Sequence, residues 1–130
     1  MREIKFRAWE KRYGEYVEIL TLYHQDGVFA ATCCNDGKTT TPYFYPEDID
    51  IEQFTGLRDK DGKEIYDGDI VDGIIISGDK YKASEVAFDG GAFSLKVDPN
   101  YWPCLYEAWP EHLKIIGNIH ENPDLLKTDY

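Results

Sequence analysis

One segment of the chain decides the fold: residues 54–71, with the sequence FTGLRDKDGKEIYDGDIV. It places Asp61–Gly62 and Asp67–Gly68 on either side of a short strand pattern, and glycine permits the positive φ angle that tight turns require. The apolar pair Ile70–Val71 then opens another strand, which is expected to continue through Ile74–Ile76. Strands this short, separated by glycine turns, favour a small curled sheet over a βαβ unit.

Within the N-terminal fifty residues, residues 4–9 alternate apolar with polar side chains, as a strand does. Residues 4–9, 16–23 and 28–33 are expected to form a β-meander, followed by a loop excursion rich in Thr and Pro. Residues 48–52, DIDIE, alternate perfectly and predict a strand with an acidic outer face. We therefore interpret residues 1–50 as an N-terminal extension ahead of the main sheet.

Residues 51–130 carry the main sheet. Within them, residues 81–88 and 92–97 flank Asp89–Gly91, which is the strongest hairpin signal in the chain. Residues 105–113 contain a proline that limits any helix there to a turn or two. Both features favour a mainly β domain with short connecting turns.

Composition describes a folded and strongly acidic protein. Hydrophobic residues make up 42% and aromatic residues 15% of the 130 residues, which disfavours disorder. The formal net charge is −11, although the first twelve residues hold five basic and only two acidic side chains. An acidic body repels phosphate backbones, so binding to duplex DNA is disfavoured. The charge serves either solubility or an acidic surface that mimics nucleic acid or docks on a basic protein.

The number of cysteines and the shortness of the apolar runs favour a cytoplasmic protein that does not bind a membrane. Cys33, Cys34 and Cys104 are odd in number and include an adjacent pair, which does not make a disulfide framework. A reducing cytoplasm is the simpler setting for them. No apolar run reaches transmembrane length, and the charged N-terminus lacks the apolar core of a signal peptide.

Patterns for metal binding and catalysis are weak. The acids of residues 59–72 lack the spacing of a calcium loop, and Cys33–Cys34 lacks the two-residue gap that places two thiolates on one zinc ion. The Asp69 carboxylate is instead expected to accept hydrogen bonds from nearby turn amides, which is a structural role. Cys34 or Cys104 with a histidine base stays open as a nucleophile pair, because such pairs meet only in space. No motif surrounds either cysteine, so we expect no catalytic residue, metal or cofactor.

Loop aromatics are the candidate partner-binding residues. Two groups lie beside prolines in predicted loops: Tyr43, Phe44 and Tyr45, and then Tyr101 and Trp102. Aromatic side chains anchor interfaces and grip extended peptides. Loop aromatics also fold back onto small cores, and both interpretations stay open at this stage.

A second candidate face lies on the first predicted strand. Lys5, Arg7 and Trp9 project opposite Ile4 and Phe6 and make a strip of basic and aromatic side chains. Such a strip can stack on the bases of a single-stranded nucleic acid. It can equally pack against the rest of the protein.

Three blocks of the chain together resemble the YopX-like family, small proteins found mainly in bacteriophages and prophages. The blocks are residues 4–9 (IKFRAW), residues 54–71, and residues 115–126 (IIGNIHENPDLL). The resemblance implies an SH3-like, partly open β-barrel from about Ile51 onward. It implies no reaction, because the family carries no established activity to transfer, and a fold alone does not specify a function.

The sequence therefore predicts a mainly β protein with an SH3-like barrel over residues 51–130 and an N-terminal β-meander over residues 1–50, either as two parts or as one compact unit. We expect a phage or prophage accessory protein that acts as a non-enzymatic protein-interaction module in the bacterial cytoplasm. Its partner, a host or phage protein, is not identified by the sequence. A nucleic-acid-related role, through single-strand binding or acidic mimicry, is the alternative. A homo-oligomer stays open.

Overall fold

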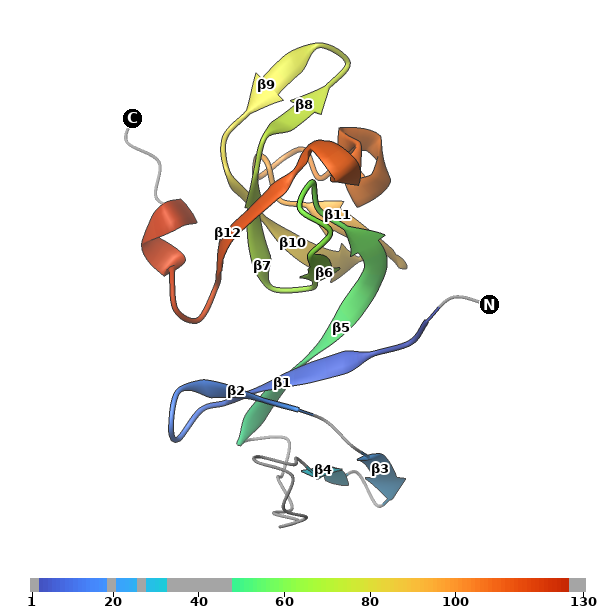
Figure 1. The fold of residues 1–130 in the computed structure, drawn as a ribbon, viewed down its shortest axis with the longest axis vertical. Helices are drawn as coiled ribbons and strands as arrows, with labels where there is room; N and C mark the ends of the chain where they lie inside the picture. The colour runs from blue at the N-terminus through green and yellow to red at the C-terminus, as the bar shows by residue number, and fades with distance from the viewer. Residues whose placement is uncertain (1–2, 19–20, 26–27, 33–47, 127–130) are drawn as a thin grey trace. The chain divides into compact units, whose positions relative to one another are not determined.

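The computed structural model describes residues 3–18, 21–25, 28–32 and 48–126 (Figure 1). The described residues form β-strands and short 3₁₀ turns, with no α-helix among them, so the mainly β prediction is confirmed. The chain divides into a first unit, Ile4–Gln53, and a second unit, Phe54–Tyr130 together with Met1–Glu3. The predicted division at residue 50 falls inside strand β5 (Ile49–Arg58).

The first unit contains three antiparallel pairings, which lie in two separate sheets. Strand β1 (Phe6–Glu10) pairs with β2 (Glu15–Glu18) on one edge and with β5 on the other. Strands β3 (Thr21–Gln25) and β4 (Val28–Thr32) pair only with each other in the described sheets. The pairings of β1 with β2 and of β3 with β4 follow the order of the predicted meander, whose second strand, residues 16–23, covers most of β2 and β3. The pairing of β1 with β5 on its other edge was not predicted, because alternation carries no information about distant partners.

A buried carboxylate joins β5 to β1 and β2. Glu52 is 4% exposed, and its Oε1 accepts hydrogen bonds from Arg7 Nε at 2.8 Å and from the Tyr16 hydroxyl at 2.9 Å. The Arg7 guanidinium also lies 4.2 Å from the centre of the Tyr16 ring. The predicted acidic outer face of residues 48–52 is thus wrong at Glu52. A buried carboxylate is tolerated there because a cation and a hydroxyl satisfy it.

The second unit is a curled sheet with two hairpins. The end of β5 pairs with β6 (Glu64–Tyr66), and a four-stranded sheet follows the order β11–β10–β7–β12. Its strands are β7 (Asp69–Asp72), β10 (Ser84–Asp89), β11 (Ala92–Leu95) and β12 (Lys114–Asn118). The hairpin predicted around Asp89–Gly91 joins β10 to β11. The strand predicted to run from Ile70 to Ile76 is instead broken at Gly73, where β7 ends and β8 (Ile74–Ile76) begins.

An aliphatic core fills the second unit. Its buried members come from β6, β7, β8, β10, β11, the loop that follows β11 and the 3₁₀ segment that precedes β12: Ile65, Val71, Ile74, Ile76, Val86, Leu95, Val97, Leu105, Ala108 and Leu113. Each large aliphatic side chain contributes roughly 1.5–3 kcal/mol on full burial. The short strands are therefore held by this shared core, since none is long enough to be stable alone.

Asp59 ties the signature segment to the last strand. Its Oδ1 accepts hydrogen bonds from the backbone N–H groups of Asp61 and Lys63, both at 2.9 Å, and its Oδ2 accepts one from Ile115 N–H at 3.1 Å. Burial raises the pKa of Asp59, but these backbone hydrogen bonds outweigh it and hold the pKa below the ordinary value of 3.8. Asp69 acts in a similar way, accepting from Tyr66 N–H at 2.7 Å, which confirms its predicted structural role.

The substitution Asp59→Asn tests this role. The amide side chain that it introduces keeps one acceptor oxygen and turns a donor toward a backbone N–H, so we expect a loss of about 1–3 kcal/mol in the free energy of unfolding at neutral pH. Because the folded pKa lies below 3.8, the carboxylate stabilises the fold above that value and loses this effect as pH falls through the folded pKa. Urea titrations across pH measure the difference.

The matched control is Asp61→Asn, because the Asp61 side chain is exposed in the same turn. It should leave stability within about 0.5 kcal/mol. A gap between wild type and Asp59→Asn that stayed constant down to pH about 2 would contradict the charge-based part of the argument.

In the turn after β12, the side chain of Asn122 hydrogen-bonds back to Asn118 and lies against Gly117. Asn122 Oδ1 accepts from Asn118 N–H at 3.2 Å, and Asn122 N–H donates to the Asn118 carbonyl at 2.9 Å. A Cβ atom added at Gly117 would lie 2.5 Å from Asn122 Oδ1 and 2.8 Å from Asn122 Cβ. This close approach therefore requires glycine at position 117, which lies in the block of residues 115–126.

Gly117→Ala should therefore lower the free energy of unfolding by about 1–3 kcal/mol through overpacking. The same substitution made together with Asn122→Gly should cost clearly less, because glycine removes both the amide and the Cβ atom that clash. A double-mutant cycle by urea denaturation measures the coupling. Equal costs in both backgrounds would show that Asn122 is not the reason for the glycine.

Candidate functional site

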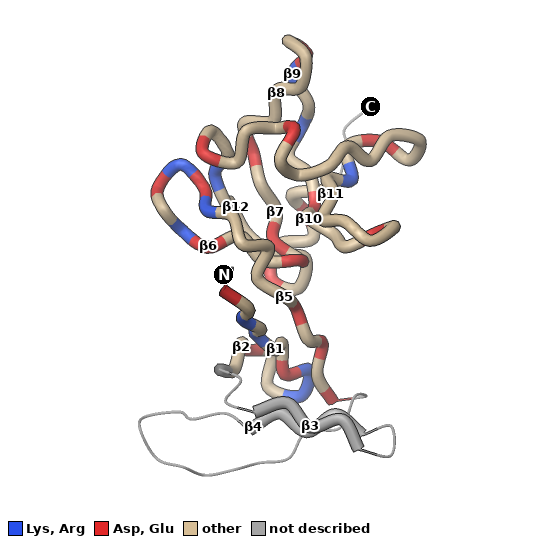
Figure 2. The backbone as a smooth tube through the Cα atoms, turned by 90° about the vertical axis from the view of Figure 1, so that its right-hand side faces the viewer, with Lys and Arg blue, Asp and Glu red and all other residues tan. Residues whose placement is uncertain are grey.

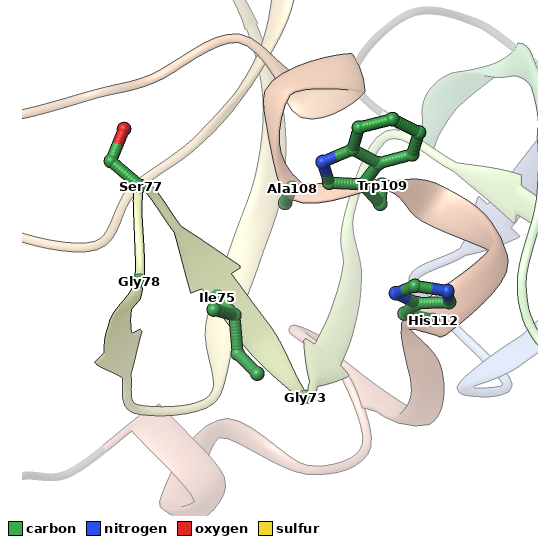
Figure 3. Close-up of a pocket in the computed structure, with 7 residues that line it drawn as sticks. All are labelled: Gly73, Ile75, Ser77, Gly78, Ala108, Trp109 and His112. Carbon is green, nitrogen blue, oxygen red and sulfur yellow. The ribbon is translucent and has the colours of Figure 1, made fainter.

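A pocket of about 440 Å³ opens between a hairpin and two 3₁₀ turns of the second unit (Figure 3). The hairpin is formed by β8 and β9 (Asp79–Tyr81), and the turns are η1 (Leu105–Ala108) and η2 (Pro110–His112). The lining residues are Gly73, Ile75, Ser77, Gly78, Ala108, Trp109 and His112.

The pocket lies at a fork in the sheet. Strand β7 has β10 on one edge and β12 on the other, and the β8–β9 pairing continues the β7–β10 pairing in the same register. Strand β12 begins at Lys114, opposite Asp72, and the chain before it turns away as η2. A Cβ added at Gly73 would lie 2.9 Å from the His112 carbonyl oxygen, so glycine is needed at the point where the two chains separate.

Backbone strain is concentrated at this fork. Among the described residues, the two non-glycine residues with positive φ are Ser77 and Trp109, each at 52°, and both line the pocket. Ser77 and Gly78 form the two-residue loop of the β8–β9 hairpin, which requires positive φ at both positions. A bulky side chain in this conformation costs on the order of 1–3 kcal/mol, and such residues cluster at sites of function.

The walls of the pocket are aromatic on one side and aliphatic on the other. Trp109 is 63% exposed and stacks on His112, with ring centres 6.4 Å apart and planes inclined by 22°. Ile75 is 46% exposed, whereas Ile74 and Ile76 on either side of it are buried in the core. The pocket therefore offers apolar surface to a ligand. Without a ligand, this apolar surface is in contact with water.

The polar side chains of Ser77 and His112 lie apart in the pocket. Figure 3 shows the Ser77 hydroxyl directed away from the His112 ring, although both residues line the pocket. In the described ranges, no group of three or more His, Cys, Asp and Glu side chains is placed to hold a metal ion. Cys104, a predicted nucleophile candidate, is half-buried at the start of η1, and Cys34 lies outside the described residues.

Tyr101 and Trp102 are exposed but lie outside the pocket lining. The Tyr101 ring packs 5.9 Å from that of Tyr81, and Lys96 Nζ lies 4.9 Å from the centre of the Trp102 ring. Burial raises the pKa of Tyr81, as do Tyr101, Asp79 and Asp98 nearby. The other predicted group, residues 43–45, lies outside the described residues. A partner-binding role for either group stays a prediction.

Lys5, Arg7 and Trp9 lie in the first unit and are half-buried. Arg7 bonds Glu52, as described above, and Trp9 meets Tyr16 edge-on at 5.0 Å. A nucleic acid that bound Arg7 Nε would have to displace Glu52 from it. The nucleic-acid interpretation stays a prediction, and these contacts give the strip a structural role.

The sequence contained two signals for the pocket that the predictions did not use. Ser77–Gly78 between two short strands marks a two-residue hairpin loop, and Trp109 precedes a proline, which disfavours the helical conformation at that tryptophan. Neither signal shows that the two segments meet, because their contact depends on the β7–β12 pairing.

Fold and site together define a small β protein with an aromatic pocket beside an incompletely paired strand. The chain matches the YopX protein family over residues 5–127. It therefore belongs to the YopX family.

Two crystal structures are similar over nearly the whole chain. Protein EF1440 from Enterococcus faecalis is 27% identical, with a TM-score of 0.67, covering 98% of this chain and 100% of that one. Protein yopX from Bacillus subtilis is 25% identical, with a TM-score of 0.64 and full coverage of both chains. No curated protein matches the chain significantly. No helix in the described ranges is long and apolar enough to cross a membrane.

Trp109→Gly tests whether the strained tryptophan is kept for stability. Glycine adopts positive φ freely, so the relief of strain should offset the lost packing of a mostly exposed ring. We expect a free energy of unfolding within about 1 kcal/mol of wild type by urea denaturation. Leu105→Ala, at a fully buried position, should instead lose about 2–5 kcal/mol. If Trp109→Gly lowered the free energy of unfolding by a similar amount, Trp109 would be kept for stability.

Proposed function

We propose that this protein is a non-enzymatic protein-interaction module of a phage or prophage, acting in the bacterial cytoplasm. In this proposal the pocket at the fork of the sheet holds a segment of the partner protein. The phage setting rests on the family, and the two similar structures come from bacteria.

One observation carries the proposal: a large aromatic side chain is exposed at a strained backbone position on the wall of a pocket. Strain and solvent exposure both oppose stability, so neither explains why a tryptophan occupies position 109. Binding does explain it, because tryptophan is among the residues that dominate interface energies.

The architecture around the pocket supports the same function. We regard the second unit as a variant of the SH3-like, partly open barrel, a fold in which loop aromatics grip extended peptides. Its curled sheet and the aromatic 3₁₀ segment beside β8 are consistent with that assignment. The Tyr101 and Trp102 side chains, exposed on the loop that leads into η1, would extend the contact surface.

Affinity capture tests the proposal. Tagged wild-type protein expressed in bacteria should retain a protein partner after nuclease treatment. The amount of partner retained by Trp109→Ala should be at least ten-fold lower. Phe88→Ala is the matched control, because Phe88 is a similarly exposed aromatic outside the pocket lining. The captured partner is then purified and titrated against all three proteins.

Equal retention by Trp109→Ala and wild type would remove the pocket from the proposal. Material that disappears with nuclease would instead favour the nucleic-acid-related role, starting with Lys5, Arg7 and Trp9.

A further inference from the structure

We infer that the pocket binds an extended, basic segment of the partner as an added β-strand on the open edge of β8. This inference rests on the proposed function and specifies its ligand. β12 pairs with one edge of β7, and the added strand would pair with the continuation of that edge along β8.

The register of the hairpin leaves polar backbone groups on that edge. Ile76 and Asp79 flank a two-residue loop, so they form a hydrogen-bonded pair, and the next pair, Ile75 and Lys80, is then non-hydrogen-bonded. In an antiparallel ladder the N–H and C=O of such a residue point away from its partner strand. For Ile75 that direction is the edge opposite β9, which is the edge continuous with the β12 side of β7.

The sheet topology shows this edge to be open. Among the described strands, β8 and β9 form a two-stranded sheet, so no third strand pairs with β8. Outside strand pairing, no backbone hydrogen bond involving Ile75 is found in the described ranges. An unpaired edge with a pocket beside it is the feature that strand addition uses.

The lining residues fit the two-residue period of a strand. Gly73, Ile75 and Ser77 are alternate positions along β8 and its ends, and all three line the pocket. An added strand also presents alternate side chains to one face. One apolar guest side chain would lie between Ile75 and Trp109, which line opposite walls (Figure 3).

Charge favours a basic segment over other occupants. Residues 54–126 contain fourteen Asp and Glu but only seven Lys and Arg, and Figure 2 shows the acidic positions spread over the strands and loops of the second unit. Around the pocket, the exposed Asp72, Asp79 and Glu111 each adjoin a lining residue, against the exposed cation Lys80, which pairs with Ile75. The exposed Trp109 ring also attracts a cationic side chain over its face. Acidic peptides and nucleic acids are repelled by the same charges.

A defined peptide tests the inference. The probe is a fluorescein-labelled ten-residue peptide of alternating leucine and arginine, titrated into the full protein by fluorescence anisotropy at two salt concentrations. We expect binding that weakens at high salt, together with slower hydrogen exchange of the Ile75 amide by NMR. A peptide with glutamate in place of arginine should bind at least ten-fold more weakly.

Backbone pairing is tested without altering the protein. N-methylation of alternate peptide amides blocks hydrogen bonds along one edge of the added strand, and two such peptides, methylated in opposite registers, block opposite edges. One should lose at least ten-fold in affinity while the other binds as the unmodified peptide does. Trp109→Ala should weaken the unmodified peptide, and Phe88→Ala should not.

Several outcomes would overturn the inference. These are equal binding of both methylated peptides, equal binding of the glutamate peptide, absence of binding at millimolar peptide, and protection that excludes the Ile75 amide. Concentration-dependent protection of Ile75 without peptide, with dimers in sedimentation, would assign the edge to a second copy of this chain. If capture of a partner still depended on Trp109 after any of these results, the proposed function would stand and only its ligand would be wrong.

Discussion

The carboxylate of Asp59 is the interaction on which the second unit depends. It collects three backbone N–H groups, two from its own turn and one from β12. The backbone bond from Lys60 N–H to the Leu113 carbonyl, at 2.8 Å, reinforces the same junction. A short polar side chain thus fixes where the last strand joins the sheet. Since β12 begins directly after η2, the same junction fixes where the chain leaves β8 and the pocket opens.

The pocket follows from a mismatch in strand length within this junction. β7 and β8 together run past the first residue of β12, so the strand edge beyond Asp72 has no partner from the described sheet. The chain uses glycine at the point of separation and a two-residue loop at the tip of the hairpin. Strain at Ser77 and Trp109 is compatible with folding because the residues beneath, Ile74 and Ile76, are buried in the core.

Local patterns in the sequence predicted the β class, the turn at Asp61–Gly62, the hairpin at Asp89–Gly91 and the structural role of Asp69, because each depends on neighbouring residues. The pairing of β1 with β5 and the burial of Glu52 were not predicted, since both depend on residues distant in sequence. The pocket belongs to the second group. The local signals, the Ser77–Gly78 loop and the proline after Trp109, do not show that the two segments meet, because only the β7–β12 pairing brings them together.

The bond between Asp59 and Ile115 joins residues 56 positions apart. Closing so long a loop carries a large entropic cost before any contact rewards it, and folds dominated by such contacts form slowly. During synthesis, the signature turn must wait for Ile115 before its carboxylate gains its third donor. For that interval β7 has an open edge along its whole length. The nascent chain therefore passes through a stage in which unintended strand pairing competes with the arrival of β12.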